Sequence, residues 1–198
     1  MSENQTPTRE TARRIFATEF NDAVYKEEPG DGERATQYML LPTGELANRI
    51  FAVGTLVEVI DDQDNDLYIR GEMVDATGEF FIDAAQFQQD AIENIRKLDT
   101  PTYVAITGKT RINDNDSGLS TKIRVESITD VSGAIYDRWV AETAKKTAER
   151  IKGFDESNET AQKANEVYDD LDLEAYRDEA IEALEDVQEM IKKEQEDE

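Results

Sequence analysis

The segment 46–131 constrains the fold of this chain most, because it reads as five short strands with one helix inserted after the third. The first strand is the long apolar run 49–60, and Gly54 lies where a strand can bend sharply enough to serve both sides of a barrel. Apolar alternation bounded by turn residues places the other strands at 67–74, 79–83, 103–112 and 121–131. The inserted helix is expected at 84–98, with apolar residues at helical spacing: Phe87, Ala91, Ile95 and Leu98.

This order of elements is that of an OB-fold, a small barrel that binds oligonucleotides and oligosaccharides. We therefore expect a mainly β protein with helical extensions, in which a five-stranded OB-fold barrel is followed by an amphipathic helix and a C-terminal acidic helix. The expected parts of the chain are a disordered N-terminus at 1–7, an N-terminal helix and extended lead-in at 8–45, the OB-fold at 46–131, the amphipathic helix at 134–152, a linker at 153–170, and the acidic helix and tail at 171–198. Thr8 is the expected N-cap of the first helix, which continues to residue 20.

The chain has no cysteine and no histidine. This excludes disulfides and thiolate zinc sites, and it removes the usual general base and the commonest transition-metal ligand. The acidic loop 62–66 does not match a calcium loop, since Leu67 and Met73 stand where glycine and glutamate are needed, and the turn 113–118 has too few spaced ligands. We therefore expect a non-enzymatic protein without metal or cofactor.

No apolar run approaches the roughly 20 residues of a membrane helix, so a cytoplasmic location is expected.

The formal net charge of −24 gives the protein surface a strongly negative electrostatic potential. Chains this acidic are often disordered, but here the acids are spread through segments with apolar periodicity, which favours folding. We favour adaptation to a halophilic cytosol of molar salt, where the Debye length falls to roughly 3 Å and self-repulsion is screened. A generic acidic protein is the alternative. In either case phosphate is repelled overall, so binding of a nucleic-acid strand has to be local or supplied by a partner.

Alternation along the strands sorts side chains between the barrel interior and its outer face. The expected interior residues are Leu67, Ile69, Met73, Phe80, Ile82, Val104, Ile106, Ile123 and Val125. OB-folds bind single strands by stacking bases on aromatic rings and by contacts to phosphate. The expected DNA-binding residues, all on the outer face, are Tyr68, Arg70, Phe81, Lys109, Arg111, Lys122 and Arg124. The alternative is that these are ordinary exposed strand residues, with Lys and Arg preventing edge pairing, and the acidic loop 61–66 counts against binding.

Three segments resemble the replication protein A-associated proteins of halophilic archaea: residues 40–56 (LLPTGELANRIFAVGTL), 77–82 (TGEFFI) and 105–109 (AITGK). Those proteins are similar in layout to the middle subunit of eukaryotic replication protein A. The resemblance covers residues 8–151 and implies a subunit of a single-stranded-DNA-binding complex, paired with a cognate large subunit, that acts in DNA replication, repair and recombination. It also implies that the helix 134–152 is the assembly helix. Its expected partner-binding residues are Ile135, Trp139, Val140, Thr143, Thr147 and Ile151.

Two functions from different classes therefore stay open. The first is an accessory OB-fold subunit, without enzymatic activity, that helps a larger protein coat single-stranded DNA. The second is a free-standing acidic protein-interaction module, an adaptor or nucleic-acid mimic, with no DNA role of its own. For the helix 134–152, the alternative to partner docking is that its stripe covers the mouth of its own barrel.

Overall fold

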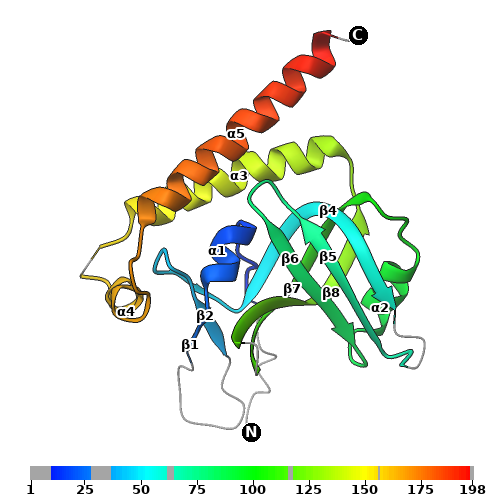
Figure 1. Cartoon of the computed structure of the whole chain (residues 1–198), viewed down its shortest axis with the longest axis horizontal. Coiled ribbons are helices and arrows are strands. Elements are labelled where there is room, and N and C mark those ends of the chain that lie inside the picture. The colour runs from blue at the N-terminus through cyan, green and yellow to red at the C-terminus, as the bar shows by residue number, and fades with distance from the viewer. Residues whose placement is uncertain (1–9, 28–36, 62–64, 116–117, 156, 197–198) are drawn as a thin grey trace, which may run out of the picture.

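The computed structural model describes residues 10–27, 37–61, 65–115, 118–155 and 157–196 (Figure 1). The strands are β1 (Tyr25–Glu27), β2 (Tyr38–Leu40), β3 (Leu46–Ala47), β4 (Arg49–Asp61), β5 (Tyr68–Val74), β6 (Glu79–Ala85), β7 (Thr102–Asn115) and β8 (Gly118–Asp130). The helices are α1 (Ala17–Asp22), α2 (Gln89–Arg96), α3 (Gly133–Lys152), α4 (Glu159–Val167) and α5 (Leu173–Glu196). Among the described helices, none is long and apolar enough to cross a membrane.

Five of the strands close a barrel in the order β4-β5-β6-β8-β7, with α2 inserted between β6 and β7. All pairs are antiparallel except β6 with β8, so this is the expected mixed barrel of the OB type with helical extensions. The first half of β4 pairs with β7 and the second half with β5, and the change of partner falls beside Gly54. A Cβ at Gly54 would lie 2.4 Å from the carbonyl oxygen of Val74, so only glycine allows the two strands to approach this closely.

The barrel interior is filled as alternation predicts. The buried residues include Ile69, Met73, Phe80, Ile82, Val104, Ile106, Ile123 and Val125. One expected interior residue is wrong: Leu67 is exposed because it precedes the first paired residue of β5. Phe87, expected on the inserted helix, lies in the turn before α2 begins and is 84% exposed. The helix expected at 84–98 is shorter because β6 continues to Ala85.

The N-terminal helix expected at 8–20 is also wrong over most of its length. α1 begins only at Ala17, and the described residues before it run beside β4 instead. The Arg13 amide donates to the Arg49 carbonyl at 2.8 Å, and the Phe51 amide donates to the Arg13 carbonyl at 2.8 Å. These bonds to a distant strand satisfy backbone groups that a local helix would otherwise have to pair. The predicted cap Thr8 and the N-terminus 1–7 lie outside the described residues.

α1 and α3 contact the barrel on the side where α5 also lies (Figure 1). α3 packs on β4, and α5 returns across α3. α4 lies within the segment expected to be a linker. Its buried face consists of two small residues, Ala161 and Ala164, and these give too weak an apolar period to indicate a helix from the sequence. Asn158 caps α4 by accepting a hydrogen bond from the Thr160 amide at 3.0 Å.

Candidate nucleic-acid interface

The pairing register aligns one row of outward side chains across the barrel. The row starts on β4, follows the closed barrel through β5, β6, β8 and β7, and returns to β4. Its residues are, in this order, Ile60, Arg70, Asp83, Arg124, Lys109 and Arg49. Basic residues predominate in this row although the chain as a whole is strongly acidic. Three of the expected DNA-binding residues, Arg70, Lys109 and Arg124, lie in this row, and Asp83 is its only carboxylate, whereas Arg111 and Lys122 are paired with each other outside it.

A hollow of about 350 Å³ is lined by three residues of this row, Ile60, Arg70 and Asp83, and by further residues mainly of β4, β5, β6 and β8. It brings together four of the seven expected DNA-binding residues: Tyr68, Arg70, Phe81 and Lys122. Phe81 is 50% exposed and Ile60 is also exposed, so the hollow has apolar surface on which a planar base could lie. Lys109, Arg111 and Arg124 stand outside the hollow, on the neighbouring strands β7 and β8.

Asp83 organises the basic side of the hollow, and sequence reasoning did not identify it. Alternation placed it on the outer face, where it does lie, but its carboxylate is covered and the residue is only 1% exposed. The Arg124 Nε donates to Oδ1 at 2.5 Å, and the Lys122 Nζ lies 3.2 Å from Oδ2. The Tyr68 hydroxyl donates to the same Oδ2 at 3.4 Å. Lys122 and Arg124, which were expected to bind phosphate, are therefore already paired with a buried acid. The alternation of side chains along one β-strand cannot indicate this contact, because it joins two strands.

Three expected cations make no ion pair within the part of the chain that the structure describes: Arg70, Lys109 and Arg111. All three are exposed. Lys109 lies between Arg124 and Arg49 in the row, and Arg49 pairs with Glu126, whose Oε2 lies 2.7 Å from Nε. The charge most accessible to a phosphate is therefore on Arg70, Lys109 and Arg111.

The lining of the hollow also contains acidic residues of β4 and β5. Glu58 and Glu72 are cross-strand neighbours, and both line the hollow. Partial burial, together with the charges of Glu79 and Glu58, raises the pKa of Glu72. At the end of β4, Asp61 pairs with Arg96, with 2.7 Å between Oδ2 and Nε, while residues 62–64 of the acidic loop lie outside the described residues. Single-stranded DNA in this hollow would thus meet both cations and carboxylates.

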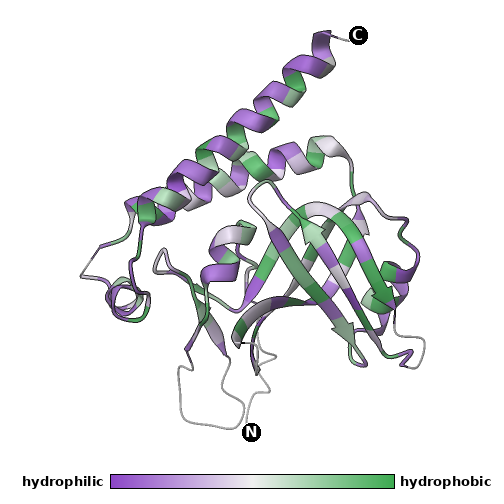
Figure 2. Ribbon diagram, viewed as in Figure 1, coloured by the Kyte–Doolittle hydropathy of each residue, from purple (hydrophilic) through white to green (hydrophobic). Residues whose placement is uncertain are grey.

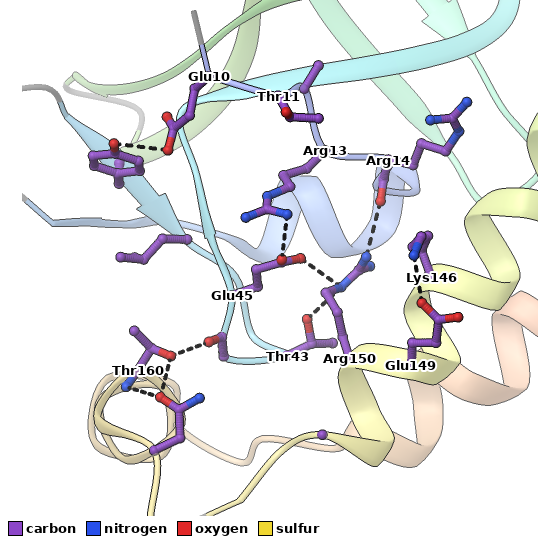
Figure 3. A pocket seen from close by; sticks show the side chains of 16 residues that line it. Glu10, Thr11, Arg13, Arg14, Thr43, Glu45, Lys146, Glu149, Arg150 and Thr160 are labelled. Carbon is purple, nitrogen blue, oxygen red and sulfur yellow. Dashed lines mark hydrogen bonds and ion pairs between the residues drawn. The ribbon is translucent and has the colours of Figure 1, made fainter. Parts of the chain in front are cut away.

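A larger hollow of about 870 Å³ lies between the N-terminal segment, the β2–β3 turn and the ends of α3 and α4 (Figure 3). Three of its cations pair with a carboxylate of the same chain: Arg13 with Glu45, Arg14 with Glu142 and Lys146 with Glu149. Arg150 is nearly buried and donates to Thr43 Oγ1 at 3.0 Å and to Glu19 Oε2 at 2.5 Å. These contacts tie α3 to α1 and the β2–β3 turn, so this hollow is stabilised internally rather than prepared for an anion.

The six expected partner-binding residues of α3 divide into two groups. Trp139, Val140, Thr143 and Thr147 are buried within the chain itself. The Trp139 Nε1 donates to the Phe51 carbonyl at 3.2 Å, and its ring meets the Phe16 ring edge-on at 5.5 Å between centroids. Ile135 is exposed and Ile151 is partly exposed. The helix that packs on α3 here is α5 of the same chain, and the partner-facing assignment of the stripe stays a prediction.

Within the described residues, no group of three or more potential ligands is arranged to hold a metal ion. No protein-family model matches the chain, and no curated protein matches it significantly in sequence.

Many solved structures match the chain, and the following two are among those that share its fold. A chain from a replication protein A heterotrimer bound to single-stranded DNA matches 71% of this chain and 98% of its own length, at 13% identity and a TM-score of 0.51. A chain from the Stn1–Ten1 complex of S. pombe matches 72% of this chain and 96% of its own length, at 11% identity and a TM-score of 0.57. At these identities the likeness establishes the fold, and function has to be argued from the site.

Proposed function

We propose that the chain is an accessory OB-fold subunit of a single-stranded-DNA-binding replication protein A complex, acting in DNA replication, repair and recombination. The observation that carries this proposal is the placement of the Tyr68 and Phe81 rings beside Arg70 and Lys122 in one hollow. Every base has a flat face, so stacking on such rings binds single strands with little regard to sequence. The role is non-enzymatic and cytoplasmic, and the acidic surface is an adaptation to molar salt.

The charges around the hollow support an accessory role rather than an independent one. Asp83 engages Lys122 and Arg124, and Glu58 and Glu72 also line the hollow. With −24 overall, the chain repels phosphate at long range. We infer that a cognate large subunit supplies most phosphate contacts, and that this chain adds stacking surface to the strand that the large subunit holds.

The same charges favour a second candidate function. A chain whose hollow holds three carboxylates, and whose overall charge is strongly negative, could serve as an acidic protein-interaction module or nucleic-acid mimic with no DNA role. The two functions differ in whether Tyr68 and Phe81 touch a base.

Photo-crosslinking tests this difference directly. A labelled oligothymidine carrying 5-iododeoxyuridine is irradiated with the full chain, at the lowest salt concentration at which circular dichroism shows the chain folded, and the adducts are mapped by mass spectrometry. We expect adducts at Tyr68 and Phe81 and none at Phe87, which is more exposed but lies outside the hollow. Adducts spread over exposed aromatic residues, or none at all, would favour the acidic module. In a parallel anisotropy titration the lone chain should bind weakly, and tight binding would contradict the accessory role.

A further inference from the structure

α5 has an apolar edge that its own chain leaves uncovered. Ala180, Ala183 and Val187 are buried against the rest of the chain. Beside this buried line runs a second one, formed by Ile181, Leu184 and Ile191, which we call the α5 edge. Ile181 is 45% exposed, Ile191 is 36% exposed and Leu184 is partly exposed. With 3.6 residues per turn these three positions fall within about 80° of one another, so they form one strip along the helix.

α5 also extends past its support. All described side chains after Val187 are exposed. Figure 1 shows this last part of α5 projecting beyond α3 and the barrel, and Figure 2 shows hydrophobic residues continuing along it. Most helical stability in proteins comes from packing of an apolar face rather than from propensity. The projecting turns carry Ile191 without such packing from the described part of the chain, which leaves the α5 edge open to another helix.

The charges on α5 indicate what kind of helix fits. Acids outnumber bases along it, and Glu174, Asp178 and Glu185 follow the solvent side of the α5 edge. Arg177 of the same helix pairs with Glu174 and Asp178, so this flank keeps a net negative charge. A second copy of the chain would bring two such acidic flanks together, which costs energy through like-charge repulsion. A helix with a narrow apolar stripe and lysine or arginine beside it would bury the edge and pair with these acids.

We propose that the α5 edge is a docking surface for a basic amphipathic helix of a partner protein. The surface is formed by a different element from the hollow of β4, β5, β6 and β8, so the proposal does not depend on DNA binding. Apolar contact at Ile181 and Ile191 supplies specificity of position, and the acidic flank supplies attraction at long range.

The test uses the full chain and a labelled synthetic helix of about three heptads with leucine at the two core positions and lysine beside them. A scrambled peptide of the same composition keeps the charge but loses the stripe. We expect the scrambled peptide to bind about tenfold or more weakly than the amphipathic one. The double variant Ile181→Gln/Ile191→Gln should bind the amphipathic peptide about tenfold more weakly than the wild type does, since it lacks both exposed apolar side chains.

The matched control is Val57→Gln/Leu119→Gln, which removes two exposed aliphatic side chains from the barrel instead. It should leave peptide binding unchanged, and circular dichroism should show that both double variants keep their helix content. Equal binding of the scrambled peptide, or wild-type binding by the α5 variant, would overturn the proposal because charge alone would explain the affinity. Sedimentation of the chain alone provides a further check. A dimer that Ile181→Gln/Ile191→Gln dissociates would make a second copy the occupant and would likewise overturn it.

Discussion

Arg124 and Asp83 face each other across the parallel β6–β8 pair, with the guanidinium Nε 2.5 Å from the carboxylate Oδ1. Lys122 approaches the other oxygen of the same carboxylate. One buried acid therefore engages two cations that would otherwise face solvent. A phosphate that binds either cation has to compete with Asp83, so this carboxylate controls how much positive charge the outer face offers.

Replacing Asp83 with asparagine should therefore strengthen binding of single-stranded DNA. We expect an affinity gain of about threefold to tenfold, because the variant releases Lys122 and Arg124 for phosphate. The slope of log K against log salt should steepen by about 0.7 for each new phosphate contact. Unfolding should become easier by about 1–3 kcal/mol, because the lost charge leaves Arg124 without its buried partner. Anisotropy titrations at several salt concentrations and urea unfolding measure the two effects.

The control for Asp83→Asn is Glu149→Gln, which makes the same change of net charge on the exposed face of α3. It should alter DNA affinity much less. If both variants gain equally, overall charge rather than the Asp83 contacts limits binding.

Replacing Phe81 distinguishes an effect on base stacking from an effect on the stability of the protein. Phe81→Ala should weaken binding of a single strand by about 1–3 kcal/mol, measured as part of the complex that holds the strand, because it removes a ring from the hollow. Its free energy of unfolding should change by less than about 0.5 kcal/mol, since the side chain is half exposed. Phe87→Ala removes an exposed ring outside the hollow and should change neither quantity. Equal losses for the two variants would show that Phe81 is an ordinary exposed strand residue.

Local patterns predicted the barrel well. The outward position of Phe81 and the burial of Phe80 and Ile82 follow from alternation alone, because the period of two is a property of the single strand. These features required no knowledge of which strands are neighbours.

Other features depend on long-range contacts, which single-strand patterns do not contain. Residues 10–16 have apolar spacing compatible with a helix, but they pair with β4, far away in sequence. Asp83 is covered because β8 lies parallel to β6, which alternation within β6 cannot indicate. The burial of Trp139 depends on where α3 docks, and the sequence left capping in cis and partner docking open.

The structure changes what Trp139→Ala is expected to do. From the sequence alone, the hypothesis is loss of the partner with the barrel still folded. Trp139 is 2% exposed, packs on Phe16 and donates to the Phe51 carbonyl. With these contacts we expect the variant to lose about 3–5 kcal/mol of folding free energy through the cavity it creates. Ile135→Ala, on the same helix but exposed, should lose less than about 0.5 kcal/mol. Denaturant unfolding measures both, and a Trp139→Ala variant as stable as wild type would favour the partner-anchor interpretation again.

The net charge predicts a dependence of folding on salt. If the acidic surface is adapted to molar salt, dilution should unfold the chain as repulsion becomes unscreened. Circular dichroism followed from molar salt to dilute buffer would record this. Sodium and potassium chloride should give the same midpoint at equal ionic strength, since screening does not depend on which ion is used. If the chain is fully folded in dilute buffer and unfolds cooperatively, adaptation to molar salt does not explain its acidic surface.

The buried carboxylate of Asp75 should make the free energy of unfolding depend on pH. Its carboxylate accepts hydrogen bonds from the Ala17 amide at 2.9 Å, where α1 begins, and from the Thr77 amide at 2.7 Å. Burial outweighs these donors and raises the pKa of Asp75 to about 6, from an ordinary value of 3.8. Because the folded-state pKa is the higher one, the folded chain binds more protons between these values. The stability that Asp75 contributes is therefore present below about pH 4 and lost as pH rises through about 6, by at most about 3 kcal/mol.

The variant Asp75→Asn isolates this contribution because it cannot titrate. The free energy of unfolding of wild type minus that of the variant should fall between pH 4 and 6 and stay level above pH 7. The variant also loses an acceptor for one backbone amide, but that loss is the same at every pH and does not change the slope. The exposed acids whose pKa is lowered, such as Glu142 beside Arg138, are present in both proteins and cancel in the difference. A difference that is flat or rises across this window would show that the amide donors, rather than burial, govern the charge of Asp75.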